Sequence, residues 1–247
     1  MEGLGQNILT MGNFNTQELS RYSRQIMLDE IGMEGQLKIK QAKVLVIGAG
    51  GLGCPSLQYL GAAGVGTLGI VDFDRVEIHN LHRQILYTAE DIGKQKAPTA
   101  ARRIQASNPF VNCIVYDVLL DDRNAENIIS QYDIVVDGSD NFLTRYLVND
   151  ICVQLNKPLV YGSILKNEGQ FTVFNYNGGN NLRDIFPEPP NPEDVPSCDL
   201  NGVMGFVPGI LGVYLANATL QVILGTYENR GLFLFDFKSF GVLKIKV

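Results

Sequence analysis

The stretch Lys43-Val44-Leu45-Val46-Ile47-Gly48-Ala49-Gly50-Gly51-Leu52-Gly53 decides the fold of this 247-residue chain. An apolar segment typical of a buried strand runs into a glycine-rich turn, and an apolar helix then continues through Ala63. A second apolar run, residues 69–71, ends at Asp72 and Asp74. This order predicts a nucleotide-binding βαβ unit, in which backbone N–H groups and a helix N-terminus face phosphate.

Composition and charge exclude several classes of protein. The net charge of −6 leaves no overall basic surface for nucleic acid. The four cysteines form no C-x-x-C pair, so neither a zinc knuckle nor a thioredoxin motif is present. Nothing resembles a signal peptide, and we expect no uncharged apolar run of about 18 residues, the length that spans a membrane. We therefore expect a cytoplasmic protein with free thiols and with no nucleic-acid or membrane partner.

The chain alternates strands and helices from Lys43 onward and then changes pattern. Such alternation predicts an α/β fold, with a Rossmann-like, mostly parallel sheet, flanking helices and an antiparallel C-terminal extension. We expect a flexible tail over residues 1–15 and a single domain over residues 16–247, with a long crossover loop over residues 176–201. The expected helices are 16–40 (as two short helices), 96–107, 125–130, 143–156 and 203–224; the expected strands are 43–47, 69–71, 112–118, 132–137, 158–161, 170–174, 232–236 and 242–247.

A basic and amide-rich cluster follows the second strand. It comprises Asn80-Leu81-His82-Arg83-Gln84 and, at the start of the next helix, Lys96. Because loops that leave the carboxyl ends of parallel strands line one crevice, we expect Arg83 and Lys96 to meet the same phosphates as Gly51. The competing interpretation is that both are solvated surface cations. His79 and His82 are interpreted as polar loop residues.

Two acids end the second strand, and either could bind a ribose. A carboxylate at this position accepts hydrogen bonds from a ribose hydroxyl. Asp72 is the expected acceptor, and Asp74 is the neighbour that could replace it. The sequence alone does not separate them.

The segment Asp137-Gly138-Ser139-Asp140-Asn141 follows the fourth expected strand and begins a helix. Asp140 or Asn141 could cap that helix by accepting backbone N–H bonds. Alternatively, Asp140 could be a ligand of Mg²⁺ beside a triphosphate, because Mg²⁺ prefers one or two carboxylates together with phosphate oxygens. The nearby Arg83 and Lys96 favour the metal interpretation.

Cysteines divide into two groups. Cys198 lies in the long loop just before the last helix, where a helix N-terminus would lower its pKa and favour reactivity. Cys54, Cys113 and Cys152 fall in strand or helix patterns and are interpreted as packing residues.

Together these motifs resemble the ThiF/MoeB/HesA family, bacterial relatives of ubiquitin-activating enzymes. The similarity extends over residues 19–246. Members adenylate the C-terminal Gly-Gly carboxylate of a small ubiquitin-like sulfur carrier protein with MgATP, and they form homodimers. A sulfurtransferase or cysteine desulfurase is a further expected partner. The motifs that carry the resemblance are Arg21-Tyr22-Ser23-Arg24-Gln25, the glycine turn, Asp72-Phe73-Asp74, Asn80-Leu81-His82-Arg83-Gln84, Lys96 and Asp140-Asn141.

The resemblance implies a role for each matching residue. The catalytic residues would be Arg24, which reaches the ATP of the other protomer, Arg83, Lys96, Asp140 as the Mg²⁺ ligand, and Cys198, which is linked to sulfur chemistry on the carrier. The nucleotide-binding residues would be Gly48, Gly50, Gly51, Gly53, Asp72, Asp74, Asn80, Arg83, Gln84, Lys96, Asp140 and Asn141.

This chain departs from the family at its zinc site. Many relatives bind structural zinc through two C-x-x-C pairs, of which the first would fall at Asn181 and Asp184 and the second after Lys246. Neither pair is present, and tetrahedral zinc needs four such ligands, so we expect no zinc. Without that staple, we expect the loop over residues 176–201 to be disordered when no carrier is bound.

Several functions share these motifs. Cys198 and Phe186-Pro187-Glu188-Pro189-Pro190 favour a ThiS-like carrier of thiamin biosynthesis over a MoaD-like carrier of molybdopterin biosynthesis or a carrier for cysteine or tRNA sulfur. An NAD-dependent oxidoreductase would use the same glycine turn and Asp72, but it would leave Arg83, Lys96 and Asp140 without a role. A carrier-binding scaffold without activity is the third class, and the intact cations argue against it.

Overall fold

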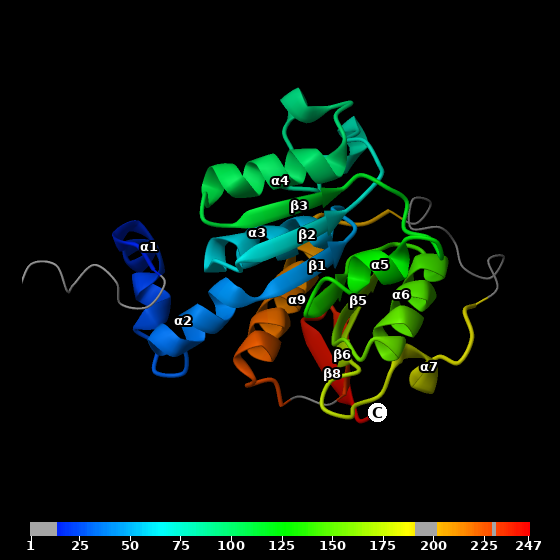
Figure 1. Ribbon diagram of the computed structural model, residues 1–247. Coiled ribbons are helices and arrows are strands. Elements are labelled where there is room, and N and C mark those ends of the chain that lie inside the picture. The colour runs from blue at the N-terminus through cyan, green and yellow to red at the C-terminus, as the bar shows by residue number, and fades with distance from the viewer. Residues whose placement is uncertain (1–13, 191–201, 229–230) are drawn as a thin grey trace, which may run out of the picture.

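An eight-stranded sheet runs through the computed structural model, which describes residues 14–190, 202–228 and 231–247 (Figure 1). The strand order is β3-β2-β1-β4-β5-β6-β7-β8. The first five strands are mutually parallel, and β6, β7 and β8 continue the sheet antiparallel, as the sequence predicts. The strands are β1 (Lys43–Ile47), β2 (Thr67–Val71), β3 (Asn112–Tyr116), β4 (Ile134–Asp137), β5 (Leu159–Leu165), β6 (Glu168–Phe174), β7 (Leu232–Asp236) and β8 (Gly241–Ile245).

Helices cover both faces of the sheet, and each face has its own apolar core. Val44 and Val46 of β1 belong to one core, and Leu45 and Ile47 belong to the other, because successive side chains of a strand point to opposite faces. Helices α3, α4 and α9 pack on the first face, and α5, α6 and α7 pack on the second. The helices are α1 (Thr16–Ile26), α2 (Gly32–Gln41), α3 (Gly53–Ala63), α4 (Lys96–Ser107), α5 (Ala125–Ile129), α6 (Phe142–Gln154), α7 (Leu182–Ile185) and α9 (Phe206–Leu224), with short 3-10 turns at Ile78–Asn80 and Ala89–Asp91.

The folded domain includes residues that precede the expected Thr16. Phe14 is buried with 4% exposure, and the Lys40 ammonium lies 4.7 Å from its ring centroid. Asn15 caps α1 through a reciprocal capping box with Glu18. The expected tail is therefore wrong at residues 14 and 15, and the rest of it lies outside the described residues.

Helix α9 corrects the expectation about long apolar runs. Its 19 residues carry no charged side chain and are long and apolar enough to cross a membrane by length and composition. However, half of this stretch is buried inside the protein, where Leu211 and Leu215 are fully enclosed between α3 and β5. The burial explains the apolar sequence as that of a core helix.

The first part of the long loop is held in place by hydrogen bonds, contrary to the expectation that it lacks a staple. Asn181 and Asp184 form a capping box that begins α7, at the very positions where the zinc cysteines would fall. Arg183 donates two hydrogen bonds of 2.7 Å to Asp150 of α6, and its guanidinium lies 4.9 Å from the Tyr146 ring centroid. The remainder of the loop, residues 191–201, lies outside the described residues.

Candidate active site

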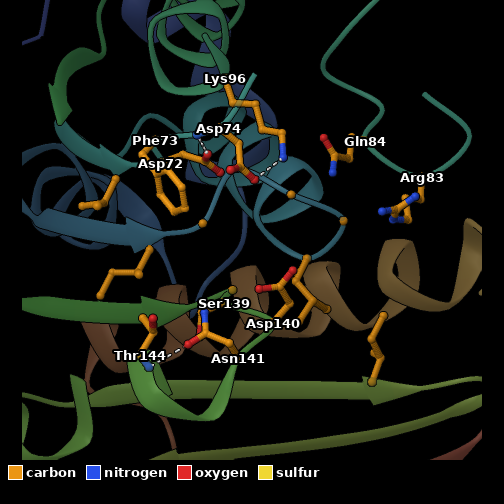
Figure 2. A pocket seen from close by; sticks show the side chains of 18 of the residues that line it. Asp72, Phe73, Asp74, Arg83, Gln84, Lys96, Ser139, Asp140, Asn141 and Thr144 are labelled. Carbon is orange, nitrogen blue, oxygen red and sulfur yellow. Dashed lines mark hydrogen bonds and ion pairs between the residues drawn. The ribbon is translucent and has the colours of Figure 1, made fainter. Parts of the chain in front are cut away.

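A cavity of about 410 Å³ opens at the carboxyl ends of β1, β2 and β4 (Figure 2). The chain proceeds from β1 through β2 to β3 on one side and returns to β4 on the other, so this is the point where the strand order reverses. Ligands of open α/β sheets bind at such a point. We call one side the cationic wall and define it by Gly48, Gly50, Gly51, Asp72–Asp74, Arg83, Gln84 and Lys96; the opposite side, the helix wall, comprises Gly138–Asn141, Thr144 and Arg145.

The glycines of the turn have two different functions. Gly48 has a positive φ of 85°, and a Cβ on Gly53 would lie 1.8 Å from the Gly48 carbonyl oxygen, so these two glycines let the turn close on itself. Gly50 and Gly51 line the cavity together with Gly48. Gly53 lies behind the turn and outside the cavity lining, where it lets the turn close; its expected role at the nucleotide stays a prediction.

The two acids after β2 are distinguished by their partners. The Asp72 carboxylate accepts hydrogen bonds from the backbone N–H groups of Ala49 and Asp74, both at 2.8 Å. Burial raises the pKa of Asp72, and the charge of Lys96 opposes that rise. Asp74 is half-exposed and pairs with Lys96 Nζ at 2.9 Å. Asp72 therefore ties β2 to the glycine turn, whereas Asp74 holds the cation.

Both expected cations lie in the cationic wall. Lys96 begins α4 and is buried with 6% exposure. Arg83 Nη1 lies 2.9 Å from the backbone oxygen of His79 and 2.9 Å from His82 Nε2. Desolvation and the charge of Arg83 lower the pKa of His82, which favours the neutral ring that can accept a hydrogen bond from Arg83. The interpretation of Arg83 and Lys96 as scattered surface cations does not hold, because both line one cavity.

The two amides of the cluster after β2 differ in position. Gln84 lines the cavity with 3% exposure, and its Oε1 has no hydrogen-bond partner among the described residues. Asn80 is buried behind the loop, where its Oδ1 accepts from the Glu77 N–H and its backbone oxygen accepts from Arg83 and Gln84. Asn80 is absent from the cavity lining and shapes the loop that presents Arg83; its expected contact with the nucleotide stays a prediction.

The helix wall combines both interpretations of the segment after β4. Asn141 is the N-cap of α6, since its Oδ1 accepts from the Thr144 N–H at 2.9 Å. Asp140 is exposed and lines the cavity opposite Asp74 and Lys96 (Figure 2). Ser139, Thr144 and Arg145 also line it and were not predicted, although their position beside a helix start was the available signal.

An apolar flank completes the cavity and was also not predicted. Phe73 and Leu119, both more than half exposed, form part of it. Exposed apolar side chains beside a polar crevice suit a planar, weakly polar group such as a nucleobase. The remaining apolar side chains of the lining are Ile47, Leu52, Val71, Val118, Leu120, Ile164, Leu165 and Val203.

The carboxylates of the cavity fit a magnesium ion that is held mainly by the phosphate oxygens of a bound nucleotide. Within the described residues, no group of three His, Cys, Asp or Glu side chains could hold a metal ion alone. Asp74 and Asp140 face the cavity from opposite walls. One or two carboxylates are the protein donors Mg²⁺ uses when phosphate oxygens complete its shell. The expectation of no zinc stays a prediction.

Arg24 and Cys198 do not join this constellation. Arg24 is exposed on α1, with Nη1 3.8 Å from Met27 Sδ, and it does not line the cavity of its own chain. Cys198 lies outside the described residues. Cys54 and Cys152 are buried and Cys113 is partly buried, as predicted for packing, and burial raises the pKa of Cys54 to about 12 and that of Cys113 to about 11.

Comparison with solved structures shows the same fold. MccB of E. coli, in a structure with AMPCPP and MccA, superposes with a TM-score of 0.79 at 20% identity, covering 92% of this chain and 71% of MccB. PaaA superposes with a TM-score of 0.78, also at 20% identity, covering 99% of this chain and 80% of PaaA.

Comparison of sequences identifies close relatives. The chain is 52% identical over 214 residues to the sulfur carrier protein adenylyltransferase of Thermus thermophilus, covering 85% of this chain and 79% of that protein. It is 48% identical over 231 residues to the adenylyltransferase and sulfurtransferase MOCS3 of Aedes aegypti, covering 92% of this chain but only 52% of the relative. It thus spans about half the length of the MOCS3 proteins that it matches. The model of the ThiF family matches residues 22–247, which include both walls of the cavity, and the chain therefore belongs to the ThiF family.

Proposed function

We propose that this chain adenylates the C-terminal Gly-Gly carboxylate of a ubiquitin-like sulfur carrier protein, with ATP as the co-substrate and release of pyrophosphate. One observation carries the proposal: Arg83 from a loop, Lys96 from the start of α4 and Asp140 from the turn after β4 line one cavity with the glycine turn. The relative from Thermus thermophilus, named for this activity, supports the choice of reaction.

The chemistry that the cavity can perform follows from its charges. The carrier carboxylate would attack the α-phosphorus of ATP, and pyrophosphate would leave. Both reactants are anions, so Arg83 and Lys96 would reduce their repulsion and stabilise charge that develops on the phosphates. Mg²⁺, held by Asp140 with Asp74 nearby, would neutralise further phosphate charge when bound. A general base is not required, because a carboxylate is already ionised near neutral pH.

Orientation of the nucleotide would come from the rest of the cavity. Gly50 and Gly51 bring backbone close to phosphate at the start of α3. Gln84 Oε1, buried without a partner among the described residues, would accept a hydrogen bond from the ligand. Phe73 and Leu119 would cover the base.

The finer parts of the proposal concern partners. We favour a ThiS-like carrier over a MoaD-like carrier, on the basis of Cys198 and residues 186–190 in the long loop. A homodimer would bring Arg24 of a second copy to the cavity, since Arg24 is exposed and outside its own chain's cavity. A sulfurtransferase or cysteine desulfurase would then act on the adenylate.

Carrier-dependent exchange of pyrophosphate into ATP tests the proposal. We expect exchange with a Gly-Gly-ended carrier and none with the same carrier lacking its last glycine.

Calorimetric titration with ATP and, separately, with NAD addresses the oxidoreductase alternative, for which only NAD would bind. Binding of the carrier without pyrophosphate release would instead indicate an inactive scaffold.

A further inference from the structure

Arg145 is a buried cation in the helix wall to which the proposed chemistry assigns no role. It lies in the second turn of α6, is only 5% exposed, and lines the cavity beside Asp140. Its guanidinium lies 5.7 Å from the ring centroid of Phe142 and 5.5 Å from that of Tyr161. These two aromatic contacts fix the plane of the guanidinium group.

The hydrogen bonds of Arg145 go to two protein groups, one in the turn before Asp140 and one on strand β5. Nη2 donates to the backbone oxygen of Ser139 at 2.9 Å, and Nη1 donates to the Tyr161 hydroxyl at 3.1 Å. Both terminal nitrogens therefore have protein partners. This differs from Lys96, whose partner is the half-exposed Asp74.

The same turn is fixed from its other side by Asp137. The Asp137 carboxylate is fully buried, and its Oδ1 accepts from the Ser139 N–H at 2.9 Å. Burial raises the pKa of Asp137, and the charge of Arg145 opposes that rise. Asp137 thus holds the N–H of Ser139 while Arg145 holds its carbonyl, so the peptide groups that lead into Asp140 have little freedom to rotate.

Asp140 itself lacks such support. Its side chain is exposed, and its carboxylate makes no hydrogen bond or ion pair within residues 14–190, 202–228 and 231–247. Its direction into the cavity (Figure 2) must therefore come from the backbone before it. A catalytic group that is displaced by about 1 Å can lower the reaction rate about a hundredfold. The backbone conformation that directs Asp140 therefore matters for the reaction.

We propose that Arg145 is a positioning residue that holds the Ser139 carbonyl and thereby aims the Asp140 carboxylate at a metal-bound phosphate; this rests on the proposed function. Arg145 acts through Asp140 and does not itself contact the nucleotide. Lysine at this position would keep the charge but could not make both hydrogen bonds in the geometry of the fork.

Calorimetric titration of ATP with and without Mg²⁺ tests this without relying on turnover. We expect Arg145→Lys to lower the affinity for ATP at least fivefold when Mg²⁺ is present and less than twofold when it is absent. Tyr161→Phe, which removes one partner of Arg145, should give a smaller loss in the same direction, and it serves if Arg145→Lys folds poorly. Arg183→Lys, a matched change at another arginine that binds α6 and a tyrosine ring, should leave the Mg²⁺ dependence unchanged.

A double-mutant cycle with Asp140→Asn separates positioning from direct contact. Because Arg145 acts through Asp140, Arg145→Lys should cause no further loss in the Asp140→Asn background. Equal losses with and without Mg²⁺, or losses that multiply in the double variant, would overturn the inference. Wild-type protein that binds no ATP at all would instead overturn the proposed function, and the inference with it.

Discussion

The cationic wall and the helix wall face each other across the cavity but hold their charges in different ways. In the cationic wall, Lys96 pairs with Asp74, whose side chain is 51% exposed, and Arg83 contacts the exposed ring of His82. In the helix wall, the buried Arg145 is bound to a backbone carbonyl and to a tyrosine hydroxyl.

The difference teaches which wall can respond to a ligand. Asp74 is half-exposed and His82 is exposed, so water can solvate these two groups when an incoming phosphate takes their place beside the cations. A buried polar group left without its partner costs about 1–3 kcal/mol, so the helix wall keeps its shape. The cations of the cationic wall could therefore exchange their protein partners for phosphate, whereas the backbone of the helix wall would keep its conformation.

The largest expected effect is on the stability of the glycine turn, which supports the cationic wall. Gly53→Ala should destabilise the protein by about 4 kcal/mol or more, because its Cβ would lie 1.8 Å from the Gly48 carbonyl oxygen. Gly50→Ala is the matched control, since the nearest atom to its Cβ is the flexible Gln84 Nε2 at 3.7 Å. Thermal unfolding followed by circular dichroism measures both. Equal melting temperatures for the two variants would contradict the division between framing and cavity-lining glycines.

The next effect separates exchangeable charge from stability. Lys96→Ala and Arg83→Ala should each lower carrier-dependent pyrophosphate exchange by about 10²–10³-fold, because each removes a cation from the expected phosphate site. The melting temperature of Arg83→Ala should stay within about 4 °C of the wild type, because Arg83 contacts an exposed His82 ring and a backbone oxygen. That of Lys96→Ala should fall somewhat more, because Lys96 is buried and its charge opposes the rise in the pKa of Asp72. Lys38→Ala, at an exposed lysine of α2, is the control. Loss of activity with equal loss of stability would show that these cations are structural.

A smaller effect is expected for the metal ligand of the helix wall. Asp140→Asn should raise the Mg²⁺ concentration needed for half-maximal exchange by about tenfold, because one carboxylate leaves a shell completed by phosphate oxygens. Asp140 is exposed, so the melting temperature should not change. Asp122→Asn, at another exposed acid, provides the control, and an unaltered Mg²⁺ requirement in Asp140→Asn would remove Asp140 from the metal site.

The smallest effect is expected outside both walls. Arg183 and Asp150 pair with side-chain exposures of 44% and 45%, so a double-mutant cycle with Arg183→Gln and Asp150→Asn should give a coupling of about 1 kcal/mol or less in unfolding free energy. Exchange activity with saturating carrier should be unchanged. A coupling of several kcal/mol would mean that the start of the long loop depends on this one pair.

The sequence predicted the elements of the site better than the direction of its side chains. Spacing placed the glycine turn, Arg83, Lys96 and Asp140 at one edge of the sheet, because the carboxyl ends of parallel strands share an edge. The sequence could not show that Asn80 and Gly53 lie behind the cavity lining. Asn80 is held there by the Glu77 N–H, and Gly53 packs against the Gly48 carbonyl, and only the folded backbone brings these groups together.

Other misses have the same physical origin. The sequence did not single out Arg145, because one of its two hydrogen-bond partners is Tyr161 on β5, sixteen residues away in sequence. The segment around α7 looked unstructured because the partners of its first turn, Asn149 and Asp150, belong to α6. Contacts between distant segments decide both cases, and local sequence patterns do not record them.

The mass of a carrier after reaction tests the central claim most directly. A ThiS-like or MoaD-like carrier ending in Gly-Gly would be incubated with this protein and MgATP and then weighed by mass spectrometry. The account predicts a carrier heavier by one AMP group with wild-type protein and an unmodified carrier with Lys96→Ala. Unmodified carriers of every class in the presence of wild-type protein, under conditions in which it binds ATP, would contradict it.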